Sequence, residues 1–408
     1  MKILIHGINF SPELTGIGRY SGEMAAWLAQ AGHEVRVVTA PPYYPRWRIA
    51  EGHANRWSVS RERNGKLTVY RCPVWVPARP SGLKRVLHLA SFAAASLPVV
   101  LWQIFWKPDV VLAVEPPLFC APQAWLAARL AGARAWLHIQ DFEIDAAFEL
   151  GLLRAGWLRR MALAVEGFWL RRFDRVSTLS EKMREKLAGK GVAADRTALF
   201  PNWVDPAGIY PMAEASALRA QLGLPPERFV ALYAGNMGEK QGMEVVLDAA
   251  AMLRQACHIH FVLCGDGAAR ARLQASHAGL SNVSWLPLQP EGKLNALLNL
   301  ADVHLLPQRA DAADLVMPSR LLGMLASGRP VLATASADSQ LGGIVAQCGV
   351  LAPAGDAVAF AAALQKLASD PAARAKLGAA GRAIAENRFS KESVLGRFER
   401  ELNEAIHA

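Results

Sequence analysis

The feature that most constrains the fold is the alternation of short apolar runs with longer helix-like segments along the whole chain. Apolar runs of strand length that are separated by helical segments are typical of a parallel sheet covered by helices on both faces. The sequence therefore predicts an α/β protein. The main predicted strands are Lys2–His6, Glu34–Thr39, Val110–Val114, Ala135–Gln140, Arg175–Leu179, Phe229–Ala234, Ile259–Cys264, Val283–Leu286, Val303–Leu306 and Arg329–Ala333.

The alternation runs twice through the chain, and a turn-rich segment separates the two runs. Phe200–Pro206 reads FPNWVDP, in which two prolines with Asn and Asp indicate a connection. We therefore predict a first domain over residues 1–205, a second over 206–385 and a terminal helical segment over 386–408. Two doubly wound domains of this kind would face a central cleft and bind ligands at the carboxyl ends of their strands.

The distribution of charge predicts an anionic partner for the first half alone. The chain of 408 residues has a net charge of +10, and residues 1–200 hold 27 Lys and Arg against 16 Asp and Glu. Basic charge suits either nucleic acid or an anionic membrane. The same residues also contain ten of the 12 tryptophans, and indole favours the lipid headgroup boundary. We expect a membrane surface as the partner and no nucleic acid.

One apolar segment in the first half is long enough to cross a bilayer. Val86–Trp106 has 21 residues without Asp, Glu, Lys or Arg, and it is flanked by Lys84, Arg85 and Lys107. A central proline and several polar side chains weaken the case for a span. We expect a re-entrant or interfacial helical pair, and the alternative is a helix buried against the sheet.

The cysteines and the N-terminus point to the cytoplasmic side of the membrane. The five cysteines are odd in number and lack a Cys-x-x-Cys pair, which favours reduced thiols over a disulfide framework or a zinc site. No pair of His and Cys has metal-ligand spacing, so we expect no metal. MKILIHGINF lacks the apolar core of a signal peptide. We predict a cytoplasmic protein that is peripherally associated with the inner membrane.

Two motifs in the second half suit a diphosphate. The glycine-rich GNMGEKQG, residues 235–242, lies between a predicted strand and helix and carries Lys240, although it is not a P-loop. Met317-Pro318-Ser319-Arg320 opens a helix predicted over Pro318–Ala326, where an arginine suits bidentate phosphate contact. The alternatives are a solvated loop lysine, a capping serine and a surface arginine.

Two motifs in the first half are weaker. Gly16 and Gly18 open a predicted helix, where backbone N–H groups can approach a phosphate or sugar, although such glycines often serve only a tight turn. His138, Asp141 and Glu143 follow or end a predicted strand and are candidate catalytic or sugar-contacting groups. A lone histidine in this position is also often structural.

Taken together, several segments resemble bacterial exopolysaccharide and O-antigen glycosyltransferases of family 4, in particular the subgroup of colanic-acid-type synthesis. They are GINFSPELTGIGRY, FPNWVDP, YAGNMGEKQG and PSRLLGMLASGRPVLAT. The resemblance implies a GT-B fold, with two Rossmann-like domains and a last helix that crosses back to the first. It also implies transfer from a UDP- or GDP-linked sugar with retention of anomeric configuration, without metal or other cofactor. The implied acceptor is a saccharide on a polyprenyl diphosphate lipid at the inner leaflet.

The resemblance also implies roles for individual residues. Lys240, Ser319 and Arg320 would hold the donor diphosphate, and Gly16 and Gly18 would let their loop close over the donor. His138 would contact the donor sugar, and the acceptor would approach the first domain near Tyr43, Tyr44 and Glu115. The predicted catalytic residues are His138, Asp141, Lys240 and Arg320, and the predicted binding residues are Gly16, Gly18, Asn236, Lys240, Pro287, Leu288, Met317, Ser319 and Arg320.

The chain departs from the family pattern at two places. Gly323 stands where many relatives carry a glutamate that binds the donor ribose, and Asn236 and Met237 stand where a second basic residue is common. We expect Arg320 to replace that charge. The competing interpretations are a nucleotide-sugar epimerase or hydrolase of the same fold and a non-enzymatic nucleotide-sugar-binding protein.

Overall fold

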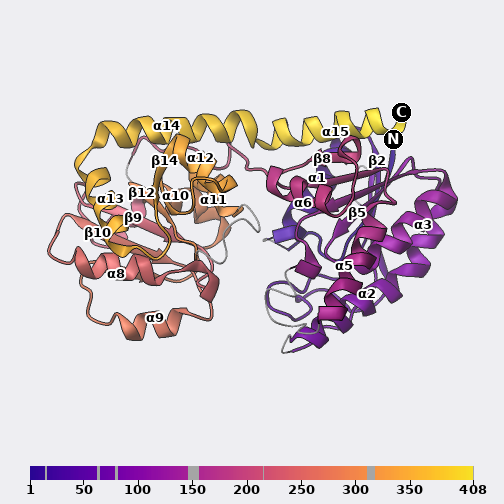
Figure 1. Cartoon of the computed structure of the whole chain (residues 1–408), viewed down its shortest axis with the longest axis horizontal. Helices are drawn as coiled ribbons and strands as arrows, with labels where there is room; N and C mark the ends of the chain where they lie inside the picture. The colour runs from indigo at the N-terminus through magenta and orange to yellow at the C-terminus, as the bar shows by residue number, and fades with distance from the viewer. Residues whose placement is uncertain are drawn as a thin grey trace. The chain divides into compact units, whose positions relative to one another are not determined.

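A computed structural model of the chain shows two compact units (Figure 1). Unit 1 comprises Met1–Pro201 and Leu395–Ala408, and unit 2 comprises Asn202–Val394. The structure describes residues 1–13, 16–61, 65–78, 81–145, 156–214, 216–309 and 318–407.

Unit 1 contains an eight-stranded sheet in the order β3-β4-β2-β1-β5-β6-β7-β8. Its neighbouring strands are parallel except β3, which pairs antiparallel with β4. The predicted strands of this unit are confirmed within one residue at each end, whereas the β3–β4 hairpin and β8 were not predicted. The strands are β1 (Lys2–His6), β2 (Glu34–Thr39), β3 (Ser58–Arg61), β4 (Leu67–Arg71), β5 (Val110–Glu115), β6 (Arg134–Ile139), β7 (Arg175–Thr178) and β8 (Thr197–Leu199).

The helices of unit 1 divide between the two faces of this sheet. Crossovers between parallel strands are right-handed, so α2, α3, α5 and α6, which step from β4 towards β8, cover one face, and α1, which steps from β1 to β2, covers the other. On the first face α2 packs against α3, and the Trp125 Nε1 of α3 donates a hydrogen bond to the Arg172 carbonyl just beyond α5, at 3.1 Å. The helical segments are α1 (Gly16–Gln30), α2 (Gly82–Trp102), α3 (Ala121–Ala131), α5 (Gly156–Leu170) and α6 (Glu181–Gly189), with short 3-10 turns η1 (Gln103–Trp106), η2 (Leu118–Cys120) and η3 (Ala194–Arg196).

The apolar segment at Val86–Trp106 forms one helix rather than the predicted helical pair. α2 continues through Pro98 and passes directly into η1. Within the described residues, Gly82–Trp106 is the one helix long and apolar enough to cross a membrane by length and composition. The alternative of a buried helix also fails, because only one stripe of α2 is buried. The buried stripe is His88, Phe92, Ser96 and Val100, and the exposed large apolar residues are Leu83, Val86, Leu87, Leu97, Trp102 and Phe105.

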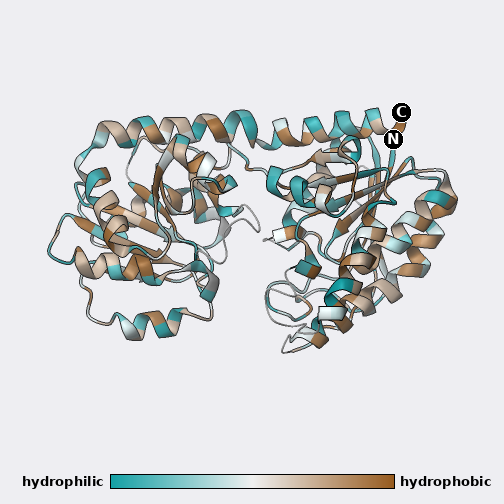
Figure 2. Ribbon diagram, viewed as in Figure 1, coloured by the Kyte–Doolittle hydropathy of each residue, from teal (hydrophilic) through white to brown (hydrophobic). Residues whose placement is uncertain are grey.

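The last helix, α15 (Lys391–His407), returns the chain to unit 1, as predicted. The Phe398 ring stacks on Phe200 with centroids 3.9 Å apart and meets the edge of Trp136 at 5.3 Å. His33 Nε2 lies 2.9 Å from Glu399 Oε1. Hydrophobic and hydrophilic residues are mixed along α15 (Figure 2), as expected for a helix with one face on a protein core.

Unit 2 contains a six-stranded parallel sheet in the order β11-β10-β9-β12-β13-β14. Four of its strands have the predicted bounds, and the strand predicted at Arg329–Ala333 lies at Val331–Thr334. The strands are β9 (Phe229–Ala234), β10 (Ile259–Cys264), β11 (Val283–Leu286), β12 (Val303–Leu306), β13 (Val331–Thr334) and β14 (Gly349–Ala352). The helical segments are α7 (Ala217–Gln221), η4 (Glu239–Gln241), α8 (Glu244–Met252), α9 (Arg270–Ser276), η5 (Glu291–Lys293), α10 (Leu294–Leu298), α11 (Arg320–Ala326), α12 (Gln340–Cys348), α13 (Ala357–Ser369) and α14 (Pro371–Arg388).

The helix predicted to open at Pro318 begins two residues later. Ser319 is its N-cap, and α11 runs from Arg320. The reason is local, because the Leu321 N–H bonds to the Pro318 carbonyl and the Leu322 N–H to the Ser319 carbonyl, which closes a 3-10 turn before the α-helical ladder starts.

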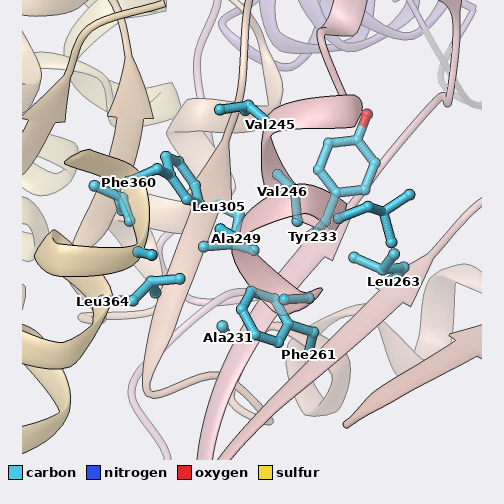
Figure 3. Packing of buried hydrophobic residues seen from close by; sticks show 14 of the residues in the cluster. Ala231, Tyr233, Val245, Val246, Ala249, Phe261, Leu263, Leu305, Phe360 and Leu364 are labelled. Atoms are coloured by element: carbon cyan, nitrogen blue, oxygen red, sulfur yellow. The ribbon is translucent and has the colours of Figure 1, made fainter. Parts of the chain in front are cut away.

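A buried apolar cluster holds the sheet of unit 2 against its helices (Figure 3). Phe261 of β10 and Leu305 of β12 lie with Val246 of α8 and Phe360 of α13, and all four are fully buried. Tyr233 lies at the edge of this cluster with its hydroxyl directed away from the aliphatic side chains. The packing therefore fixes the end of β9, where the glycine-rich segment starts.

The five cysteines are free thiols, and all except Cys257 are buried. Among the described residues no group of His, Cys, Asp or Glu has an arrangement that would hold a metal ion.

Candidate functional site

The glycine-rich segment of unit 2 lies at the point where the strand order reverses. β9 is followed in the chain by β10 and β11 on one side, whereas β12 lies on its other side. The loop after β9 and the segment after β12 therefore flank a topological switch point, where doubly wound sheets bind ligands. Gly235 follows β9 directly, and Arg320 is the first residue of the helix that follows β12.

Glycine is required at the ends of β9 and β10 because the two loops touch through their backbones. A Cβ on Gly265 would lie 1.9 Å from the Gly235 carbonyl oxygen, and a Cβ on Gly267 would lie 2.5 Å from the Met237 carbonyl oxygen. The Met237 N–H donates to the Asp266 carbonyl at 2.8 Å. These contacts give the glycine-rich loop a fixed shape.

Arg320 is bound to this loop from the opposite side of the switch point. Its Nη1 donates to the Tyr233 hydroxyl at 2.8 Å, and its Nη2 donates to Gln241 Oε1. A Cβ on Gly235 would lie 3.1 Å from Nη1. Arg320 Nε is buried and has no hydrogen-bond partner among the described residues. The arginine is thus held in place with one donor still unsatisfied, which is the condition expected of an anion-binding group.

Tyr233 joins the core to the loop. Its hydroxyl accepts from Arg320 and donates to the Asn236 carbonyl at 2.6 Å. Burial raises the pKa of the phenol, and the nearby guanidinium partly opposes that shift. The tyrosine therefore stays neutral and acts as a fixed hydrogen-bonding strut. Its role was not predicted, because in the sequence it reads as one more apolar residue of a strand.

The other predicted binding residues of unit 2 are in part exposed and in part outside the described structure. Lys240 lies in η4, next to Gln241, but its side chain is outside the described part of the structure, as is the whole of Met317. Ser319 is exposed, and its hydroxyl makes no capping bond to α11. Asn236 is exposed on the glycine-rich loop.

The predicted binding residues Pro287 and Leu288 follow β11 at the same edge of the sheet. The Pro287 carbonyl accepts hydrogen bonds from Cys264 Sγ at 3.2 Å and from Gln289 Nε2 at 2.9 Å. Leu288 beside it is exposed. The carbonyl of Pro287 is therefore already occupied, whereas Leu288 presents an apolar surface.

Gly323 is packed where many relatives would have a glutamate. A Cβ at this position would lie 3.3 Å from Leu298 Cδ1 and 3.6 Å from Ile209 Cδ1. Both neighbours are apolar, and the contact at 3.3 Å is tight, so a side chain here would require Leu298 to shift. The packing around this position therefore suits a glycine.

In unit 1 the loop after β1 lies at the corresponding switch point between β1 and β5. Gly16 opens α1 with φ +63°, and a Cβ on Gly18 would lie 2.4 Å from Glu13 Oε2. Glu13 is buried and its Oε1 accepts hydrogen bonds from the Tyr43 and Tyr44 N–H groups, each at 3.0 Å. Glu13 thus ties the glycine loop to the segment after β2. A carboxylate inside an otherwise uncharged glycine loop was the available signal for this role.

His138, the predicted sugar-contacting histidine, is buried inside unit 1. Its Nδ1 is 3.0 Å from Ser177 Oγ, and its Nε2 is 3.0 Å from Gln140 Nε2. The ring packs on Phe200 with centroids 4.7 Å apart. Burial lowers the pKa of His138 to about 3. The imidazole is therefore neutral and has both nitrogens engaged, which fits a structural role.

The acidic residues near the ends of β5 and β6 include two whose pKa is raised by burial. Glu115 is fully buried, and neither carboxyl oxygen has a hydrogen-bond partner among the described residues. Burial raises its pKa well above the ordinary value, with neighbouring carboxyls adding to the shift. Burial also raises the pKa of Glu143 to about 7, and Asp141 contributes to that shift. Asp141 and Glu143 are both partly buried, whereas Glu115 is fully buried.

Two family models cover most of the chain. Residues 15–203 match the model of the glycosyl transferase 4-like domain, and residues 228–370 match the model of the family described as glycosyl transferases group 1. The chain is 49% identical over 349 residues to WcaI of Escherichia coli K12, a protein provisionally assigned as a colanic acid biosynthesis glycosyl transferase. That alignment covers 84% of this chain and 85% of WcaI.

Solved structures share the fold at low sequence identity. Sucrose-phosphate synthase from Thermosynechococcus elongatus aligns with a TM-score of 0.77 at 20% identity and covers 99% of both chains. Anabaena HepE, solved in complex with UDP-glucose, aligns with a TM-score of 0.70 at 17% identity and covers 99% of this chain and 100% of its own. The two-unit architecture with its parallel sheets is therefore that of GT-B enzymes, as the sequence predicted.

Proposed function

Because the chain belongs to the glycosyltransferases that join a 4-like domain to a group 1 domain, we propose a specific reaction for it. It transfers a sugar from a UDP- or GDP-linked donor, with retention of anomeric configuration, to a lipid-linked saccharide in the synthesis of a colanic-acid-type exopolysaccharide. The similarity to WcaI supports the polymer class. HepE, which binds UDP-glucose, supports a nucleotide-sugar donor.

The observation that carries the donor site is the arrangement of Arg320 against the glycine-rich loop. The leaving group of the reaction is a nucleoside diphosphate, whose negative charge grows as the glycosidic bond breaks. Fixed cations stabilise such charge without having to reorganise. Arg320, held by Tyr233 and Gln241, is one such cation, and we assign Lys240 as the second. Two cations on the diphosphate support transfer without a metal.

His138 has no part in this proposal, because its ring is buried and bonded on both sides. Asp141 remains the candidate for contact with the sugar or the acceptor. Ser319, Asn236 and Leu288 are exposed at the same sheet edge and are assigned to donor binding.

We also assign α2 as the surface through which unit 1 rests on the inner leaflet. Its apolar outer residues from Val86 to Phe105 lie between the basic pair Lys84 and Arg85 and the single Lys107. An apolar helix face with basic ends suits an anionic bilayer. A lipid-linked acceptor would be met there, which favours a transferase over an epimerase acting on a soluble donor.

The donor site is tested by thermal denaturation with UDP, GDP, ADP and dTDP. A ligand that binds the folded state raises the melting temperature. We expect one nucleoside diphosphate to do so, and we expect Arg320→Ala and Lys240→Ala each to abolish the shift and sugar transfer while the unliganded protein still melts cooperatively. Arg254→Ala, which changes an exposed residue beyond the end of α8, is the control. An unchanged shift in Arg320→Ala would remove that arginine from the donor site.

A further inference from the structure

Three neighbouring helices of unit 1 carry exposed apolar side chains on one face of its sheet. α2, α3 and α5 cover the same face and lie side by side (Figure 1). α2 packs on α3, and the Trp125 ring of α3 meets the Trp169 ring of α5 with centroids 6.0 Å apart. Besides those of α2, exposed large apolar residues occur on α3 and on the second half of α5, and they are Leu126, Leu130, Val165 and Phe168. The apolar surface therefore continues past α2.

These four side chains lie on the outer side of their helices. Leu126 and Leu130 are one helical turn apart, and Val165 and Phe168 are three residues apart, so each pair shares one side of its helix. The buried residues lie largely on the opposite side, towards the sheet. They are Ala121, Gln123, Ala124, Ala127 and Ala128 on α3 and Glu166, Gly167 and Leu170 on α5.

The outer surface of the three helices carries basic residues and no acidic ones. α2, η1, α3 and α5 are described throughout, and their one acidic residue is Glu166, which is buried. Lys84 and Arg85 are exposed at the start of α2 and form no ion pair with any described residue. An apolar surface with unpaired cations at its border complements an anionic lipid leaflet, where the chains are apolar and the headgroups negative.

The apolar surface is confined to these helices. On α6, the next helix of this face and described throughout, the surface carries the ion pairs Lys182–Glu185 and Arg184–Glu181 and no exposed large apolar side chain. In the described part of unit 2, exposed large apolar residues occur singly on separate segments, and they are Tyr210, Met252, Leu288 and Val358. Single residues of this kind are ordinary, whereas a contiguous apolar surface indicates an interaction site.

We propose that α2, α3 and the second half of α5 form one face that lies flat on an anionic lipid leaflet. The sheet of unit 1 is then parallel to the membrane. Because all three outer surfaces must meet the lipid together, the axis of α2 lies in the plane of the leaflet. The helix that is long enough to cross a bilayer therefore does not cross it.

This orientation also sets the height of the strand ends above the lipid. One layer of helices separates the sheet from the leaflet, and a helix with its side chains is about 10 Å thick. The carboxyl ends of β5 and β6, where Asp141 lies, are then within reach of a saccharide on a lipid diphosphate. The presence of that acceptor rests on the proposed function, whereas the three-helix face is argued from unit 1 alone.

Depth-dependent fluorescence quenching tests the orientation on the full chain bound to phosphatidylglycerol vesicles. Leu97→Cys, Leu130→Cys and Val165→Cys place one label on each helix, in a Cys257→Ser background because the other cysteines are buried. We expect all three labels to be quenched more by a lipid with its quencher near the headgroup than by one with its quencher at the chain end. A label at Val358→Cys, 66% exposed on unit 2, should be quenched by neither.

Two quenching patterns would overturn the proposal. Strongest quenching of the Leu97 label by the deep quencher, with the Leu130 and Val165 labels unquenched, would mean that α2 crosses the bilayer. Shallow quenching of the Leu97 label alone would leave α2 as the contact surface and remove α3 and α5 from it.

Vesicle sedimentation gives a second readout. Leu130→Ser and Val165→Ser should each weaken partition about fivefold, since part of each side chain already packs on the protein, and Val358→Ser should leave it unchanged. Lys84→Gln should weaken partition about fivefold into phosphatidylglycerol and leave partition into phosphatidylcholine unchanged. Unchanged partition of Leu130→Ser and Val165→Ser, with loss of a lipid-free dimer, would assign the face to a second copy of the chain and overturn the proposal.

This proposal and the donor site fail separately. Loss of the nucleotide-induced thermal shift with all three labels still quenched would reject the donor site alone. An intact nucleotide shift with the Leu130 and Val165 labels unquenched would reject the three-helix face alone.

Discussion

A substitution at Gly235 tests whether the shape of the donor loop is needed for nucleotide binding. Its φ of +152° opposes any side chain, and so does Arg320 Nη1, which would lie 3.1 Å from a Cβ at this position. We expect Gly235→Ala to abolish the nucleotide-induced thermal shift and to lower the free energy of unfolding by about 1–3 kcal/mol. Gly343→Ala is the control, because that exposed glycine lies within α12 with no atom near its Cβ, and the change should be neutral or stabilising. Full nucleotide binding by Gly235→Ala would contradict the assignment.

Glu143 is the residue with the clearest pH dependence. Its pKa is raised by burial from 4.5 to about 7, so between these values the folded protein keeps a proton that the unfolded chain releases. The stability of the wild type should therefore be greatest below this interval and fall through it, by up to about 3 kcal/mol. Glu143→Gln keeps an oxygen for the Leu118 N–H and should make that decline smaller, while Glu115, whose pKa burial also raises, continues to contribute to it. Urea denaturation at pH 5 and pH 8 measures it, with the exposed Glu185→Gln as control. The same decline in Glu143→Gln would refute the prediction.

At the scale of the element, α2 with η1 offers a test of membrane contact. Phe105 is 84% exposed at the end of this segment. We expect Phe105→Ser to weaken partition into phosphatidylglycerol vesicles about tenfold, which matches the loss of one buried aromatic side chain, without changing the melting temperature. Leu288→Ser removes an exposed apolar residue of unit 2, 73% exposed, and should leave partition unchanged. Similar effects of both changes in a sedimentation assay would count against α2 as the contact surface.

The elements of the fold differ in how well the sequence predicted them. Buried parallel strands such as β9 and β10 were predicted with correct ends, because both faces of such strands are apolar. The hairpin strand β3 was missed, since all four of its residues are exposed and carry no apolar pattern. α2 was misread as a helical pair because Pro98 suggested a break that neighbouring packing tolerates.

The candidate site was predictable only in part for a similar reason. The glycines around Gly235 and the arginine at Arg320 follow from motif and strand position. The hydrogen bond between Tyr233 and Arg320 joins segments far apart in the chain. The hydrogen bonds that Glu13 accepts from the N–H groups after β2 do the same. The burial of His138 likewise depends on Ser177 and Phe200, which the local sequence around the histidine does not reveal.

For the whole molecule, the return of α15 to unit 1 means that a substitution on the buried face of this helix should destabilise unit 1 and not unit 2. Phe398 is buried against Phe200 and Trp136, so Phe398→Ala should cost about 3–5 kcal/mol of unfolding free energy. We expect the loss to appear in unit 1, with nucleotide binding by unit 2 retained at low denaturant. Arg400→Ala, an exposed change on the same helix, should stay within about 0.5 kcal/mol of the wild type. An equally small effect of Phe398→Ala would refute the packing role of α15.

The return of the chain also fixes an order of events during synthesis. Unit 2 is one continuous stretch, Asn202–Val394, whereas unit 1 needs Leu395–Ala408 in addition to its first 201 residues. The ribosome therefore completes every residue of the second unit before it supplies Leu395–Ala408, the part of α15 that belongs to the first unit. Until then the aromatic surface around Phe200 and Trp136 lacks its cover, so the nascent first unit depends longest on protection from aggregation.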